Sequence, residues 1–201
     1  MIYDPTYPII LEDEYPQRDW NNFYENLKEH IPSAMPKPLG PEVIMRMFVD
    51  DDYAGDGANR RSRTGFLIFL NEAPIAWYSN KQSRVENLVV GSDFIAMQSV
   101  LSETIEGTRY KLRLMGATLD SPTYIYRDNM SVIHNTSTPE STLKKKANSV
   151  CYHYIHEAVA AHECRTGHIN THENPADIPT KPFLPSGDKL LGKQDPILLY
   201  R

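Results

Sequence analysis

The stretch MFVDDDYAGD, residues 47–56, runs from apolar side chains into three consecutive aspartates and a turn that contains glycine. Upstream, the sequence VIMRMFV at residues 43–49 is rich in β-formers and predicts a strand that ends at Asp50. Downstream, residues 63–70 and 75–79 predict two more strands, joined as a hairpin by the four-residue turn NEAP. Negative charge is therefore concentrated where the first of three predicted strands ends.

Helices and strands alternate after these three strands. Apolar residues recur at helical spacing from residue 92 to 114, and Gly116 follows the end of that segment. Further along, the pattern predicts a strand over 122–128, a short helix over 129–136 capped by Asn129, a helix over 148–162, a strand over 164–170 and a helix that starts with Asn174 and Pro175. This order predicts an α/β fold with a five-stranded mixed sheet flanked by helices.

The chain divides into three segments by composition. Residues 1–42 are acidic and rich in proline and predict a connecting segment, with one short helix over residues 19–31 capped by Asp19. Residues 43–183 hold the predicted α/β domain. Residues 184–201 have no clear period and predict a loose tail.

Composition excludes several classes of protein. The net charge of −5 argues against a protein that coats nucleic acid along its whole surface. Its two cysteines have no CxxC spacing and are expected to be reduced thiols. No signal peptide and no apolar run of membrane-spanning length is visible, so we expect a protein that is not secreted, has no membrane partner and works in the cytoplasm or nucleus.

Four aspartates lie at the ends of predicted elements. Asp50 and Asp128 end strands, Asp93 opens the long helix, and Asp177 lies in the first turn of the last helix. In α/β folds such positions gather at one edge of the sheet. Two carboxylates about 4 Å apart repel by roughly 4 kcal/mol at an effective dielectric near 20, and divalent cations cancel this cost. Hard oxygen ligands indicate two Mg²⁺ ions, or Mn²⁺, as in two-metal phosphodiester hydrolysis.

Two other interpretations of the opening stretch stay open on these residues alone. The FVDD sequence also occurs in the metal-binding hairpin of polymerases, which requires a second strand directly after it and another aspartate upstream on a strand. Alternatively, the three aspartates form an acidic turn at the surface. Strand alternation predicts that Asp51 faces away from Asp50 and that Asp52 lies on the same side as Asp50.

Several motifs stand in a specific order along the chain. FVDDDYAGDGANRRSRTGFLIFLNEAPIAWYSNKQS, YIYRDNMSVIHNT, YHYIHE and ENPADIPTKP resemble successive motifs of the ribonuclease H domain in copia-type LTR retrotransposon polyproteins. The resemblance covers residues 43–183 and implies a ribonuclease H-like fold. It also implies a metal-dependent endonuclease that cuts the RNA strand of an RNA–DNA hybrid, next to a reverse transcriptase portion of the same polyprotein, in the cytoplasm, including virus-like particles, or in the nucleus.

The resemblance assigns metal binding and catalysis to Asp50, Asp93, Asp128 and Asp177. Asp93 stands where the family has glutamate, and its side chain is one methylene shorter. Since active sites tolerate only about 0.5 Å of misplacement, this departure predicts lowered activity or a shift toward Mn²⁺. It also supports a different function, in which the chain is a degenerate copy of a retrotransposon domain that binds nucleic acid without cutting it. His168, or else His172, is expected to assist product release.

Contacts with the hybrid are expected to be electrostatic. The predicted substrate-binding residues are the following basic and amide side chains: Arg60, Arg61, Lys81, Asn129, Lys144, Lys145 and the adjacent Lys146. Asn129 has the alternative role of a helix cap. Arg127, beside Asp128, either adds a cation to the site or is an edge-strand arginine that faces the other way.

Overall fold

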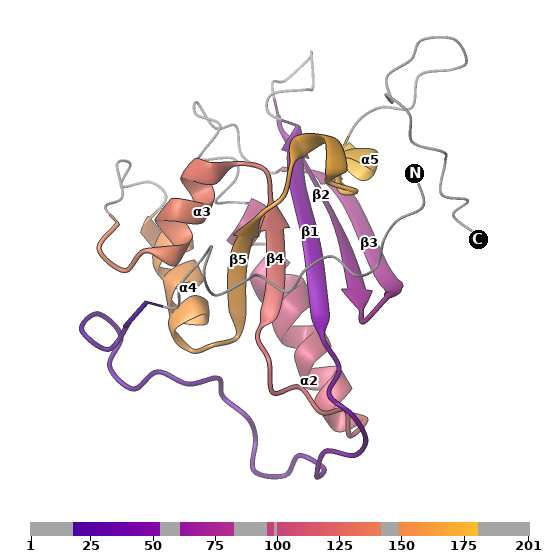
Figure 1. The fold of residues 1–201 in the computed structure, drawn as a ribbon, viewed down its shortest axis with the longest axis vertical. Helices are drawn as coiled ribbons and strands as arrows, with labels where there is room; N and C mark the ends of the chain where they lie inside the picture. Colours follow the sequence, from indigo (N-terminus) through magenta and orange to yellow (C-terminus); the bar gives the residue numbers. More distant parts are fainter. Residues whose placement is uncertain (1–17, 53–60, 83–95, 99, 142–148, 181–201) are drawn as a thin grey trace.

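The computed structural model describes residues 18–52, 61–82, 96–98, 100–141 and 149–180. A five-stranded sheet forms the centre of this part of the chain, in the order β3-β2-β1-β4-β5. Its strands are β1 (Met45–Asp52), β2 (Arg63–Leu70), β3 (Ala73–Lys81), β4 (Thr123–Arg127) and β5 (Cys164–His168). β1, β2 and β3 pair antiparallel, whereas β4 pairs parallel to both β1 and β5. The mixed sheet predicted from the sequence is confirmed (Figure 1).

The hairpin between β2 and β3 is tighter than predicted. Leu70 pairs with Ala73, so that the turn has two residues, Asn71 and Glu72, and not four. Asn71 adopts a positive φ of 53°, which asparagine tolerates better than most residues. Its side-chain oxygen also accepts a hydrogen bond from the backbone N–H of Ile44 at 3.0 Å. The backbone N–H of Asn71 also donates to the Ile44 carbonyl at 2.8 Å, so the turn is tied to the residue that precedes β1.

The helices follow the predicted order. Residues 96–98 and 100 are helical and continue through a π-helical turn, η1 (Leu101–Ile105), into α2 (Glu106–Leu114). Residues 92–95 and 99 of the predicted segment lie outside the described residues. The other helices are α3 (Met130–Ser137), α4 (Ser149–Ala160), the short 3₁₀ helix η3 (Thr171–Glu173) and α5 (Asp177–Thr180). None of the helices among the described residues is long and apolar enough to cross a membrane.

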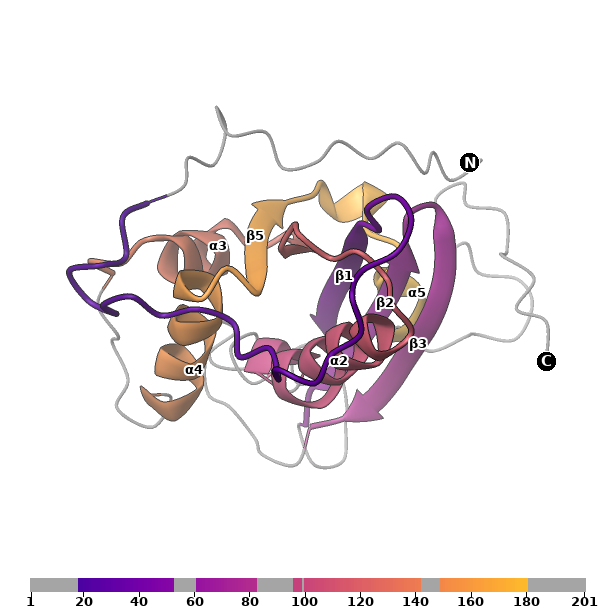
Figure 2. The same cartoon turned by 90° about the horizontal axis from the view of Figure 1, so that it is seen from below.

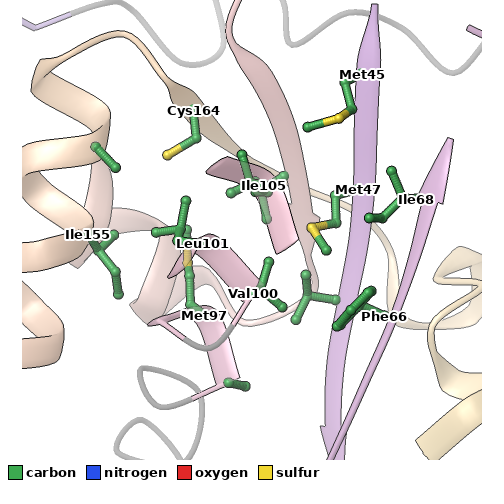
Figure 3. Close-up of a cluster of buried hydrophobic side chains, with 14 of the residues drawn as sticks. Met45, Met47, Phe66, Ile68, Met97, Val100, Leu101, Ile105, Ile155 and Cys164 are labelled. Atoms are coloured by element: carbon green, nitrogen blue, oxygen red, sulfur yellow. The ribbon is translucent and has the colours of Figure 1, made fainter. Parts of the chain in front are cut away.

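Apolar side chains cover both faces of the sheet. The larger cluster joins alternate residues of β1, including Met45 and Met47, to Leu101, Ile105 and Ile155 of the helices (Figure 3). The smaller cluster lies on the opposite face and contains Phe48, Leu67, Phe69, Tyr124, Tyr126, Ile169 and Ala176. A strand covered on both faces is expected to be apolar at successive positions, as β1 is from Met47 to Val49, although Arg46 interrupts the run before them. Cys151 and Cys164 are buried free thiols, in agreement with the prediction.

The helix predicted over residues 19–31 is absent. Trp20 accepts backbone hydrogen bonds from Phe23 and Tyr24, and this single turn ends before Asn26, whose φ is 53°. A short helix is stable only when its apolar face is buried, but 51% of Phe23 and 51% of Ile31 stay exposed. Trp20, the first apolar residue of the predicted helix face, is the one that is buried, so the periodicity does not produce a helix here.

Residues 18–42, called the arm below, run along the domain past α4 and α2 before entering β1 (Figure 2). The Trp20 ring packs edge-to-face on buried His156, with centroids 4.9 Å apart. Glu29 forms ion pairs with Arg109, at 2.9 Å, and with Arg113. Burial alone would raise the pKa of Glu29, but the hydrogen bonds from the two arginines outweigh it and lower the pKa to about 2. The arm is thus held against the domain by two contacts, the aromatic contact of Trp20 and the ion pairs of Glu29.

Candidate active site

The carboxyl ends of β1 and β4 bring two predicted ligands to one edge of the sheet. These strands are parallel, and Phe48 pairs with Tyr126, so the same register brings Asp50 level with Asp128. α5, which begins at Asp177, lies beside this end of β1 (Figure 1). Three of the four predicted aspartates therefore lie in the same region: Asp50 at the end of β1, Asp128 directly after β4 and Asp177 at the start of α5.

The pKa of Asp50 is affected by its burial and by the charges around it. Burial is the main cause that raises the pKa of its carboxyl group to about 6 from the ordinary 3.8. The negative charges of Asp177 and Asp128 raise the pKa further, while a hydrogen bond from Thr180 and the charge of Arg127 lower it. Asp50 is therefore not part of an acidic turn at the surface. It is a largely buried carboxylate beside two others.

α5 reaches Asp50 through Thr180. The buried Thr180 hydroxyl donates to Asp50 Oδ2 at 2.6 Å. Asp177 lies three residues earlier, so both side chains project from one side of the same short helix. Asn174 supports this position, because its side chain donates to the Val49 carbonyl of β1 at 3.2 Å and caps the N–H of Ala176 at 3.1 Å.

Gly65 on β2 explains how α5 comes so close. Gly65 pairs directly with Asp50. A Cβ at this position would lie 2.6 Å from Thr180 Cγ2 and 3.0 Å from Pro179 Cγ. Side-chain atoms do not approach that closely, so a larger residue would push the helix off the sheet.

Asp128 also has a partner from the segment before α5. Thr171 of η3 donates a hydrogen bond to Asp128 Oδ2 at 3.0 Å. The neighbouring Asn129 caps α3, since its side chain accepts from the N–H of Ser131 at 3.0 Å. The cap predicted for Asn129 is confirmed, and its contact with substrate stays a prediction.

Asp51 and Arg127 form an ion pair on the other face of the sheet. Arg127 Nη2 lies 3.1 Å from Asp51 Oδ1, and 1% and 4% of the two side chains are exposed. The prediction that Asp51 faces away from Asp50 is confirmed by this pairing. The prediction of an edge-strand position for Arg127 is wrong, because β4 lies between β1 and β5. A buried guanidinium requires a carboxylate, and Asp51 provides it.

The complete metal site is not formed by the described residues. No three or more His, Cys, Asp or Glu side chains lie close enough to hold a metal ion in the part of the chain that the structure describes. Asp93, the remaining predicted ligand, lies outside those residues. Asp50 and Asp128 each already accept a hydrogen bond from a threonine hydroxyl. The four-ligand arrangement stays a prediction.

Some of the residues predicted to bind substrate or to assist product release are described by the structure, and the others lie outside the described residues. Lys81 is exposed at the end of β3, in a row with Arg63 and Asp52 across the sheet, and Arg61 is exposed just before β2. His168 is exposed at the end of β5 and pairs in register with Arg127, while His172 is exposed in η3. The other basic positions, Arg60, Lys144, Lys145 and Lys146, lie outside the described residues.

The sequence patterns above do not single out three residues that the structure places at the site: Gly65, Thr171 and Thr180. A signal for Thr180 exists, because it follows Asp177 at a helical spacing of three. Gly65 interrupts an otherwise apolar strand, which often marks a close approach of another segment. Thr171 carries no such local signal.

No family model matches the chain, but curated proteins with similar sequences exist. Over 144 residues, 72% of its length, the chain is 29% identical to the retrovirus-related Pol polyprotein from transposon RE2 of Arabidopsis thaliana. Over 143 residues, 71% of its length, it is 33% identical to that from transposon TNT 1-94 of Nicotiana tabacum. The chain spans only 10% of either polyprotein.

A solved structure shares the fold. The N-terminal ribonuclease H domain of a Mycobacterium tuberculosis protein, fused to maltose binding protein, superposes with a TM-score of 0.51. The match covers 69% of this chain and 91% of that chain at 12% sequence identity. The predicted ribonuclease H-like fold is therefore confirmed, and the polymerase-hairpin interpretation of the FVDD stretch is wrong.

Proposed function

This chain has the ribonuclease H fold and is homologous to one segment of retrovirus-related Pol polyproteins, and on that basis we propose that it is an endonuclease acting on RNA–DNA hybrids. The reaction would be metal-dependent cleavage of the RNA strand during reverse transcription of a copia-type retrotransposon. The observation that carries the proposal is the mutual approach of Asp50, Asp128 and Asp177. The charges of Asp128 and Asp177 both raise the pKa of Asp50, although the three residues lie far apart in the sequence.

The donor set fits hard divalent cations. Asp50, Asp128 and Asp177 offer only carboxylate oxygens, which suit Mg²⁺ or Mn²⁺ better than zinc. Burial, and then the charges of Asp177 and Asp128, raise the pKa of Asp50, which supports a cation as an additional partner of this carboxylate. We propose two ions held by these three residues and Asp93. When bound, they would supply a nucleophilic water and stabilise the leaving oxygen.

The chain's own residues have three further tasks in this proposal. The carboxylates hold their positions because Thr180 and Thr171 donate hydrogen bonds to them. Lys81 and Arg61 are exposed near the same edge and are assigned to phosphate contacts, as are Arg60, Lys144 and Lys145. Asn129 is assigned to the 2′-OH or the backbone of the hybrid, and His168 to product release.

The relatives support a role inside a larger protein. Both are named as retrovirus-related Pol polyproteins, and this chain matches a small part of each. We propose that a reverse transcriptase portion of the same polyprotein is its partner, in the cytoplasm, including virus-like particles, or in the nucleus. The net charge of −5 supports a need for such a partner in substrate binding. Neutralisation of phosphates by basic side chains provides much of the affinity for nucleic acid, and an acidic chain by itself is expected to bind weakly.

A second function is favoured by a single residue. Asp93 replaces the glutamate of the motif that the sequence resembles, and a side chain shortened by one methylene places the carboxylate further from its target. On this second proposal the chain binds the hybrid without cutting it.

One experiment separates the two functions. The purified 201-residue chain is incubated with a hybrid labelled on its RNA strand, in Mg²⁺ and separately in Mn²⁺, beside Asp50→Asn and Asp93→Glu. Cleavage that disappears in Asp50→Asn is the result expected for the nuclease. Cleavage only in Asp93→Glu would identify a site impaired at that position. If none of the folded proteins cuts the hybrid, the nuclease proposal is refuted.

A further inference from the structure

We propose that Thr180 is a positioning residue of the active site, which holds the carboxylate of Asp50 in place and ties the helix carrying Asp177 to the strand carrying Asp50. This inference rests on the proposed function, since it concerns the same carboxylates. Thr180 is not itself assigned to the metal or to the substrate. Its effect is exerted through Asp50.

The first argument is the geometry of the hydroxyl. Thr180 Oγ1 lies 2.6 Å from Asp50 Oδ2, 3.1 Å from the carbonyl oxygen of Asp177 and 3.3 Å from that of Ala176. The hydroxyl has a single proton to donate. The shortest of the three contacts is to the carboxylate, and a hydrogen bond to a charged acceptor is also the strongest kind available. The hydroxyl therefore donates its proton to Asp50 in preference to the backbone carbonyls of the helix.

The second argument is the way the helix is seated. Asp50, Gly65 and Ser79 lie side by side on β1, β2 and β3. Each contacts α5 differently: Asp50 accepts from Thr180, Gly65 leaves room for the methyl group of Thr180, and the Ser79 hydroxyl donates to the carbonyl of Pro179. The three paired residues of β1, β2 and β3 thus all contact α5, and Thr180 takes part in two of these three contacts.

The third argument is burial. Only 1% of Thr180 is exposed, so water does not replace its hydroxyl when that hydroxyl is removed. Asp50 would then lose a donor and gain rotational freedom, while a bound cation requires its oxygens at a fixed place. Loss of a partner that orients a metal ligand typically weakens metal affinity or activity by about 10- to 100-fold.

The test uses two substitutions at Thr180 and one elsewhere. Thr180→Val keeps the shape and removes the hydroxyl, whereas Thr180→Ser keeps the hydroxyl. Thr136→Val is the matched control, because Thr136 is a fully buried helical threonine whose hydroxyl bonds to backbone carbonyls and to Thr166. For each full-length protein we would measure the Kd for Mn²⁺ alone by titration calorimetry, the melting temperature, and kcat and KM on the hybrid.

The expected result is a Mn²⁺ Kd raised about 10- to 100-fold in Thr180→Val. Thr180→Ser should restore it, Thr136→Val should leave it unchanged, and kcat should fall in Thr180→Val with little change in KM. A Mn²⁺ Kd in Thr180→Val equal to that of the wild type overturns the inference, as does a wild type that binds no Mn²⁺. If the wild type binds Mn²⁺ but cuts no hybrid, the proposed function fails while the Kd comparison still decides the role of Thr180.

Discussion

Replacing Asp50 with asparagine should stabilise the metal-free protein at pH 8, although it abolishes the proposed activity. The wild-type fold buries a carboxylate whose pKa is raised from 3.8 to about 6. Each pKa unit corresponds to about 1.4 kcal/mol, so the ionised side chain lowers the free energy of unfolding by about 3 kcal/mol once the pH is well above 6. Asparagine has no charge to bury and keeps an oxygen that accepts from Thr180. We therefore expect a gain of about 1–3 kcal/mol.

The pH dependence follows from the direction of the shift. The folded protein holds the Asp50 proton more tightly than the unfolded chain does, so wild-type stability is lost as the pH rises from 3.8 to about 6. The penalty is complete above that range and vanishes below it. The advantage of Asp50→Asn should consequently be largest at pH 8 and should shrink toward pH 4.

Urea unfolding in EDTA at the two pH values measures this difference. Asp52→Asn is the control for the change in net charge, because Asp52 lies two residues further along the same face of β1. Added Mg²⁺ should stabilise the wild type more than Asp50→Asn, by mass action on the folded state. An Asp50→Asn variant that is no more stable than the wild type at pH 8 would refute the reasoning.

Two further predictions concern the packing of α5 against β2 and the ion pair of the arm. Gly65→Ala should cost about 1–3 kcal/mol of unfolding free energy and reduce cleavage, because its Cβ would meet the helix at 2.6 Å. Gly107→Ala is the control for space: its Cβ meets nothing within 4 Å, and it should gain up to about 1 kcal/mol from helix propensity. A urea midpoint of Gly65→Ala equal to that of the wild type would contradict the prediction. Glu29→Gln should cost about 2 kcal/mol at pH 7, since it leaves Arg109 buried without a carboxylate, although the partial exposure of Glu29 limits the loss. The wild-type advantage should fade as the pH drops from 4.5 toward about 2; a loss equal at pH 3 and pH 7, or equal to that of exposed Glu25→Gln, would argue against the ion pair.

The element order could be predicted because local signals agree with one another. β-formers in MRMFV and RTGFLIFL, and caps such as Asn129, act over a few residues, and the sheet places them as expected. Local signals failed where packing decided the outcome. Residues 19–31 have helical periodicity, but Phe23, Leu27 and Ile31 each stay 40% or more exposed, so the gain from a buried face is missing.

The sequence by itself determined which aspartates stand at the ends of strands and helices. Asp50, Asp128 and Asp177 could be selected because element ends are set by neighbouring residues and by the period of the pattern. Their mutual approach, the hydrogen bond between Thr180 and Asp50 across 130 residues, and the need for glycine at position 65 were decided only by the tertiary structure. The physical reason is that these contacts depend on the strand order and on the seating of α5, which no pattern within a short window of sequence contains.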